Sequence, residues 1–190
     1  RKGKGYQSCS MNMIFGGNPG SAKTTVAKLF AGIAKEKGIL KSGAFVERGG
    51  MDLDGLGCVK AIREAFLAAK GGVLFIDEAY SLVDDRGGSF GDEAINTIVQ
   101  EMENHRDELI VIFAGYSGEM ETFLKRNPGL RSRIAYHVPF NDYSVEELCD
   151  IAEIMASKKN ITISEDARSK LKDVFETAVL DDDFGNGRYV

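Results

Sequence analysis

The residues with the clearest chemical signal form the stretch Gly17-Asn18-Pro19-Gly20-Ser21-Ala22-Lys23-Thr24-Thr25. The stretch fits the phosphate-loop pattern G-x-x-x-x-G-K-[ST] at every fixed position except Ala22, where the pattern has glycine. In such a loop, backbone N–H groups and the start of the following helix cradle phosphate oxygens. Lys23 would reach the β- and γ-phosphates, and the Thr24 hydroxyl would ligate Mg²⁺. The stretch therefore predicts a nucleotide site with a magnesium ion.

Ala22 is the one departure from this pattern. If its position requires a positive φ, the alanine Cβ costs on the order of 1–2 kcal/mol. No hydrogen-bond donor is removed, so we expect weaker nucleotide binding with the chemistry intact. The alternative is an ordinary glycine-rich turn with a chance Lys-Thr. The apolar strand before the loop, the helix after it and the acids downstream argue against that alternative.

Two carboxylates follow the apolar run Val73–Ile76, namely Asp77 and Glu78. At the carboxyl end of a strand, Asp77 would hold the hydration shell of Mg²⁺. Glu78 would act as the general base that polarises the attacking water. A solvated acidic pair at the end of a core strand is the alternative, and the phosphate loop upstream makes it the weaker one. A glutamate here also favours hydrolysis over transfer to a small-molecule acceptor.

The elements that must position these residues are short apolar strands alternating with amphipathic helices. Strands are expected over 11–15, 44–47, 73–76, 109–114 and 134–140, and helices over 24–37, 58–70 and 92–105. Residues at helical spacing are Val26, Leu29, Phe30 and Ile33 in the first helix, Val59, Ile62, Phe66 and Ala69 in the second, and Ile95, Ile98, Val99 and Met102 in the third. The polar, glycine-rich segment 81–91 is expected to be a loop. Unbroken apolar strands separated by helices indicate an α/β fold with a parallel sheet covered on both faces.

The character of the chain changes after Phe140. Ser144 and Glu147 form a capping box that opens a helix to about residue 157, and Ser164 caps another helix to about residue 180. We therefore expect an α/β domain over residues 1–140 and a small all-helical domain over residues 141–190. A further helix is expected to begin where the chain stops at Val190, so the helical domain is expected to be incomplete.

Composition narrows the function classes. The 190 residues carry 24 Lys and Arg against 29 Asp and Glu, a net charge of -5 that disfavours a nucleic-acid partner. The three cysteines, Cys9, Cys58 and Cys149, are widely spaced and are expected to be buried thiols of a cytoplasmic protein. No apolar run has the length of a membrane span, so no membrane partner is expected.

Three segments, GNPGSAKTT, GGVLFIDEAYSL and NPGLRSRI, together resemble AAA+ ATPases. More narrowly, they resemble the subfamily of stage V sporulation protein K and the red-type rubisco activase. The resemblance runs from Met11 to Val190. It implies a P-loop NTPase fold with a five-stranded parallel sheet of order 5-1-4-3-2 and a helical lid. It also implies ATP hydrolysis at the subunit interfaces of a homo-oligomeric ring, usually a hexamer.

The same resemblance assigns further residues. Arg131 and Arg133 occupy the arginine-finger region, where one subunit's guanidinium acts on its neighbour's ATP, and likeness to S-R-F motifs favours Arg133. A basic loop that only steers phosphate is the alternative. Arg188, after Gly185-Asn186-Gly187, resembles the sensor 2 arginine that touches the γ-phosphate. Tyr116 falls at the sensor 1 position, where the family usually has Asn or Thr.

The pore-loop position of the family is the weakest match. Relatives often carry an aromatic residue that grips a polypeptide, whereas segment 52–57 is acidic and offers only Leu56.

The leading hypothesis is a Mg²⁺-dependent ATPase that remodels a protein partner of unknown identity. The alternative is a nucleotide-gated assembly scaffold with slow or vestigial hydrolysis. A P-loop kinase and a nucleic-acid motor are disfavoured by the Asp-Glu pair, the finger region, the lid and the net charge.

Overall fold

The structure is a computed structural model that describes residues 10–83, 90–181 and 184–190. In chain order, the strands and α-helices are β1 (Met13–Gly17), α1 (Lys23–Glu36), β2 (Phe45–Gly49), α2 (Cys58–Ala68), β3 (Val73–Asp77), α3 (Phe90–Asn104), β4 (Ile110–Gly115), α4 (Ser117–Arg126), α5 (Pro128–Arg131), β5 (Tyr136–Phe140), α6 (Val145–Ser157) and α7 (Glu165–Ala178). Short 3-10 helices are η1 (Gly50–Leu53), η2 (Ala79–Val83) and η3 (Asn186–Arg188). Cys9, one of the three predicted thiols, lies outside the described residues.

The strands form one sheet of order β2-β3-β4-β1-β5. This is the expected order 5-1-4-3-2 taken from the opposite edge, so the fold prediction is confirmed. The pairs β2–β3, β3–β4 and β4–β1 are parallel, with Gly49 opposite Asp77 and Gly16 opposite Gly115. The carboxyl ends of four strands therefore meet along one edge of the sheet, which is where ligands bind in open α/β sheets.

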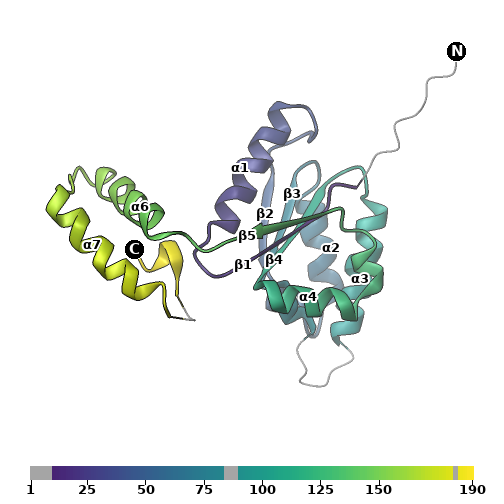
Figure 1. Cartoon of the computed structure of the whole chain (residues 1–190). Helices are drawn as coiled ribbons and strands as arrows, with labels where there is room; N and C mark the ends of the chain where they lie inside the picture. Colours follow the sequence, from purple (N-terminus) through teal and green to yellow (C-terminus); the bar gives the residue numbers. More distant parts are fainter. Residues whose placement is uncertain (1–9, 84–89, 182–183) are drawn as a thin grey trace, which may run out of the picture. The chain divides into compact units, whose positions relative to one another are not determined.

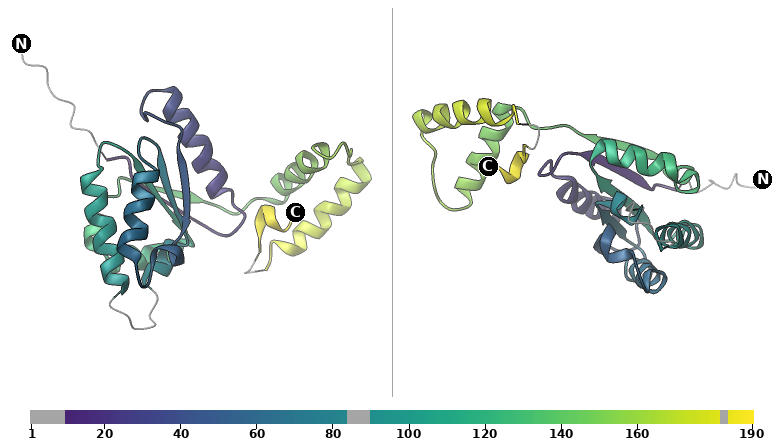
Figure 2. Two further views of the ribbon diagram at one scale, coloured as in Figure 1. Left: turned by 180° about the vertical axis from the view of Figure 1, so that it is seen from behind. Right: turned by 90° about the horizontal axis from the view of Figure 1, so that it is seen from below.

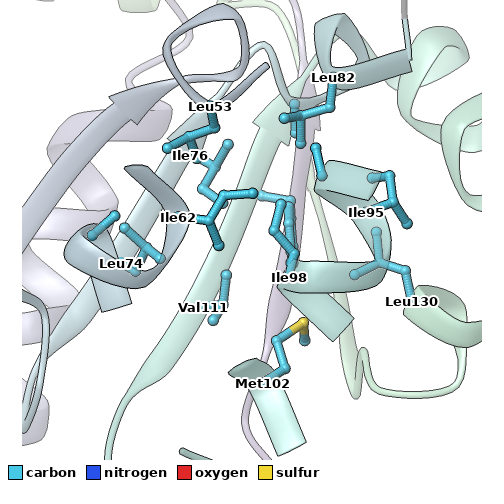
Figure 3. Packing of buried hydrophobic residues seen from close by; sticks show 14 of the residues in the cluster. Leu53, Ile62, Leu74, Ile76, Leu82, Ile95, Ile98, Met102, Val111 and Leu130 are labelled. Atoms are coloured by element: carbon cyan, nitrogen blue, oxygen red, sulfur yellow. The ribbon is translucent and has the colours of Figure 1, made fainter. Parts of the chain in front are cut away.

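One face of the sheet carries the main hydrophobic core. Side chains alternate along each strand, and Ile14, Leu74, Ile76, Val111 and Phe113 face this core. Helices α2, α3 and α4 cover them with the buried side chains Ile62, Phe66, Ile95, Ile98, Met102, Met120, Phe123 and Leu124. Ile62, Ile95, Ile98 and Met102 are labelled in Figure 3. The predicted inward residues of helices α2 and α3 are all buried in this core or packed against it.

Helix α1 lies on the other side of the sheet from α2 and α3 (Figures 1 and 2). The predicted helix is confirmed, but the predicted apolar stripe is not the face that packs on the sheet. Ala27, Ala31 and Ala34 are at most 1 % exposed. Three of the four predicted apolar residues are exposed, Val26 at 39 %, Leu29 at 62 % and Ile33 at 55 %, and Phe30 is half-buried. Three alanines at i, i+4 and i+7 form the contact because a small side chain lets the helix backbone approach closely.

Three segments differ from the predicted elements. Helix α4 was not predicted, although Met120, Phe123 and Leu124 have helical spacing and are buried. Residues 128–131, for which no element was predicted, form the short helix α5, and proline stands at its first position. The expected loop over 81–91 is shorter, because η2 extends to Val83 and α3 begins at Phe90. Residues 84–89 lie outside the described part of the chain.

By contacts the chain divides into two compact units. The first comprises the chain up to Gly16 with Thr24–Pro139, and the second comprises Gly17–Lys23 with Phe140–Val190. In the second unit, α6 and α7 pack around Leu148, Cys149, Phe175 and Phe184. The capping box is confirmed: the Glu147 N–H donates to Ser144 Oγ and the Ser144 N–H donates to Glu147 Oε2. No helix among the described residues is long and apolar enough to cross a bilayer.

Candidate nucleotide site

The phosphate loop connects the end of β1 to the first turn of α1. Lys23, the first residue of α1, turns its ammonium back over the loop. Its Nζ donates to Gly17 O at 2.7 Å and to Asn18 O at 2.8 Å. The Ser21 hydroxyl donates to Asn18 O at 2.7 Å, which tightens the same turn. A flexible cation thus stands beside the N–H groups that a helix start leaves free, which is the donor set that a triphosphate requires.

Ala22 adopts the conformation that the missing glycine would adopt freely. Its φ is 67°, and Gly20 in the same loop has a φ of 72°. The position of Ala22 therefore requires a positive φ. The alanine Cβ in the left-handed region costs on the order of 1–2 kcal/mol. The loop keeps its phosphate-binding curvature at the cost of local strain.

The turn that carries Arg188 belongs to the same unit as the phosphate loop and contacts it. The Gly187 N–H donates to Gly20 O at 3.2 Å. A Cβ on Gly20 would lie 2.1 Å from Gly185 O, so only glycine allows this approach. The Arg188 side chain is exposed. Two residues that sequence reasoning missed, Asp142 and Asn186, also bond to the loop.

The predicted catalytic acids stand at the carboxyl edge of the sheet in the first unit. Asp77 ends β3, and its Oδ1 accepts the Glu78 N–H at 3.0 Å. Glu78 is exposed and has a φ of 48°. The Ser81 hydroxyl and N–H hold its carbonyl, with oxygen distances of 2.7 Å and 2.9 Å. A non-glycine residue held in the left-handed region is characteristic of functional sites, where surrounding contacts maintain the strain.

Two tyrosines lie beside this acid pair. Tyr116 follows β4 and is 40 % exposed, and its ring centroid is 6.1 Å from that of Tyr80. Burial, followed by the charge of Glu78, raises the pKa of Tyr80 to about 12. Tyr80 therefore keeps its proton at neutral pH. The structure thus places the sensor 1 candidate against Tyr80, two residues after Glu78.

The two arginine-finger candidates differ in their surroundings. Arg131 is exposed, whereas Arg133 is half-buried. Arg133 donates from Nη1 to Gly129 O at 2.9 Å, and its Nε lies 3.5 Å from Glu103 Oε2. Asn12, which precedes β1, donates to Arg133 O at 3.3 Å. Arg133 therefore lies toward the amino ends of the strands, away from Asp77 within the same unit.

Comparison with family models places both parts of this geometry in one family. Residues 13–142 match the model of the ATPase family associated with various cellular activities (AAA), and residues 144–190 match the AAA lid domain. The chain belongs to the AAA ATPase family. The family and the sheet order therefore agree with what the sequence motifs indicated.

Curated relatives agree with this assignment. The AAA chain is 43 % identical over 189 residues to stage V sporulation protein K of Bacillus subtilis, covering 95 % of this chain and 58 % of that protein. It is 44 % identical over 174 residues to protein CbbX of Cereibacter sphaeroides, covering 90 % and 56 %. It is 40 % identical over 203 residues to the ESX-1 secretion system protein EccA1 of Mycobacterium leprae, covering 99 % and 35 %. The chain thus spans little more than half the length of the first two.

A solved structure supports the fold. The crystal structure of the FIGL-1 AAA domain in complex with ADP matches with a TM-score of 0.55 at 18 % identity. The match covers 80 % of this chain and 50 % of that one. At this identity the likeness concerns the arrangement of strands and helices.

Proposed function

We propose that this AAA chain binds ATP and hydrolyses it with the help of Mg²⁺, and that hydrolysis remodels a protein partner. One observation carries the proposal: β3 ends at Asp77, with Glu78 directly after it, at the sheet edge where Gly16 of β1 pairs with Gly115. The phosphate loop begins directly after Gly16. Carboxylates and a phosphate loop that start from one edge are the parts that nucleotide hydrolysis requires.

Each predicted residue has a chemical role in this proposal. The loop residues 17–25 bind the phosphates through backbone N–H groups and Lys23. Thr24 and, through water, Asp77 hold Mg²⁺, which neutralises charge on the phosphate oxygens when it is bound. The carboxylate of Glu78 accepts a proton from the attacking water. Tyr116 and Arg188 sense the nucleotide from β4 and from the lid.

The finger residue is proposed from exposure. Arg131 is exposed and can reach a second subunit, while Arg133 is engaged by Glu103 and by Gly129 O. We therefore propose Arg131 as the arginine that acts on a neighbour's ATP in a homo-oligomeric ring. This reverses the preference that S-R-F likeness gave to Arg133. We retain the division into an ATPase domain over 1–140 and a lid over 141–190 as part of the proposal.

The client-facing segment is proposed to be the loop around η1. Met51 is 75 % exposed and Leu56 is 93 % exposed, while Leu53 between them is buried. Asp52 is exposed and Asp54 half-buried in the same stretch. An acidic loop with two projecting aliphatic side chains favours a basic or amphipathic protein segment over an acidic one.

Two variants test the hydrolytic site. Lys23→Ala should lower the affinity for Mg·ATP ~10- to 100-fold, because hydrogen bonds to charged groups are worth ~1.5–3 kcal/mol. Glu78→Gln should retain that affinity while turnover falls ~10²- to 10⁴-fold, the range for a general base. Binding is measured by calorimetry and turnover by phosphate release on the full-length protein. Wild-type turnover in Glu78→Gln would remove Glu78 from its role.

The strain at Ala22 favours a second candidate, a nucleotide-gated assembly scaffold with slow hydrolysis. Light scattering of the full-length protein with and without ATP, compared with its ATPase rate, separates the two. ATP-dependent assembly with negligible turnover supports the scaffold. Turnover that rises with assembly supports the remodelling ATPase.

A further inference from the structure

A small polar cluster joins the phosphate loop to the lid within the second unit. We call Asn18, Asp142 and Asn186 the loop–lid clasp. The Asp142 carboxylate accepts hydrogen bonds from Asn18 Nδ2 at 2.9 and 3.1 Å and from Asn186 Nδ2 at 2.7 Å. Asn186 Nδ2 also donates to Pro19 O at 3.3 Å. One carboxylate thus holds a loop side chain and a lid side chain at the same time.

Asn186 is suited to this role by burial and by backbone shape. It is 0 % exposed and has a φ of 50°, a conformation that Asn tolerates better than most residues. Its Oδ1 accepts the Tyr143 N–H at 2.9 Å, so both ends of its amide are bonded. A fully satisfied buried amide has one orientation, and it therefore fixes the turn that precedes Arg188.

The clasp bonds to side-chain and carbonyl groups of the loop. It holds Asn18 by its side chain and Pro19 by its carbonyl, and the adjoining Gly187 N–H holds Gly20 O. Three successive loop residues are thereby tied to lid residues. The bonds occupy carbonyls and an amide side chain, and they leave the backbone N–H groups of the loop for a ligand.

We propose that Asp142 and Asn186 are positioning residues of the phosphate loop, so that the lid sets the shape in which the loop binds phosphate. The consequence for nucleotide affinity rests on the proposed function, whereas the clasp itself needs no nucleotide. By reciprocity, a nucleotide that holds the loop also holds the lid turn of Arg188.

An exchange of the two side chains tests the proposal. Asn186→Asp keeps the acceptor for the Tyr143 N–H but loses both donors and places two carboxylates together. The double variant Asp142→Asn with Asn186→Asp restores one donor and one acceptor between positions 142 and 186, with their positions swapped, and leaves Pro19 O without its donor. Asn18→Ala breaks the clasp from the loop side and leaves the lid intact. Asp166→Asn, at an exposed lid acid in the first turn of α7, is the matched control.

The first measurement is amide hydrogen exchange over residues 17–23 of the whole chain without nucleotide. We expect ~10-fold faster exchange in Asn186→Asp and in Asn18→Ala, partial recovery in the double variant, and no change in Asp166→Asn. Tenfold corresponds to ~1.4 kcal/mol of opening free energy. Unchanged exchange in Asn18→Ala, or a double variant no better than Asn186→Asp, overturns the clasp.

The second measurement is the affinity for Mg·ADP by calorimetry. We expect ~10-fold weaker binding in Asn186→Asp and partial recovery in the double variant, whereas a bond without a positioning role would leave the affinity unchanged in both. Faster exchange with unchanged affinity overturns the positioning role. A wild-type chain that binds no nucleotide overturns the proposed function, while the exchange result still supports the clasp.

Discussion

Helices α1 and α2 both pack on the sheet, yet they do so with opposite kinds of surface. Helix α2 buries Ile62 and Phe66, and its stripe is the one that periodicity indicates. Helix α1 buries only alanines and exposes its aliphatic stripe. The difference shows that helical spacing identifies a helix and its stripes, but not which stripe the sheet accepts. Contact distance decides that, because alanine allows the closest approach.

The largest effect is expected where a large side chain fills the core. Phe66→Ala should destabilise the chain by ~3–5 kcal/mol, because the cavity left in a packed core adds to the lost burial. Phe66 is 0 % exposed and lies beside the His105 ring, so neighbouring atoms have little freedom to fill the space. Denaturant unfolding measures the change. A loss below about 1 kcal/mol would mean that the α2 face is loosely packed.

A smaller effect is expected from overpacking the alanine face. Ala31→Leu should cost ~1–3 kcal/mol, because the added carbons have no space between α1 and the sheet. Ala31 is 1 % exposed. The midpoint temperature of thermal unfolding should fall by ~2–4 °C for each kcal/mol of stability lost. The matched control is Gly32→Ala, at the exposed neighbouring position, where a Cβ meets nothing within 4 Å. An unchanged midpoint for Ala31→Leu would show that there is unfilled space between the alanine face of α1 and the sheet.

The smallest effect is expected on the exposed stripe. Leu29 of α1 and Leu67 of α2 are both 62 % exposed, which makes them a matched pair across the two helices. Leu29→Gln and Leu67→Gln should each change stability by no more than about 0.5 kcal/mol. Denaturant midpoints compare them directly. A clear loss in Leu29→Gln alone would show that the α1 stripe is covered in solution.

Much of the candidate site was predictable because its signal is local. Lys23, Asp77 and Glu78 stand in short motifs whose residue types state their chemistry. The element positions followed from apolar runs and caps such as Ser144. Helix α4 was not predicted, because Gly115 and Gly118 are typical of a turn and Gly is a poor helix former. Its buried residues Met120, Phe123 and Leu124 carried a usable signal at helical spacing.

Other features depend on residues far apart in the chain. No local pattern joins Asn18, Asp142 and Asn186. Asn18 and Asp142 lie 124 positions apart, and Asp142 and Asn186 lie 44 positions apart. The same holds for the pairing of Arg133 with Glu103, which leaves Arg131 as the exposed arginine. Contacts between residues far apart in the sequence depend on the tertiary packing of the chain, which local sequence patterns do not specify.

The sequence by itself determined the family-defining motifs and the order of the five strands and most helices, because each follows from residue type and near-neighbour sterics. Only the tertiary structure decided which face of α1 packs, which arginine is exposed, and which lid residues hold the phosphate loop. These outcomes depend on backbone distance and on the geometry of hydrogen bonds between remote segments. They are set when the chain packs, after the local elements have already been specified.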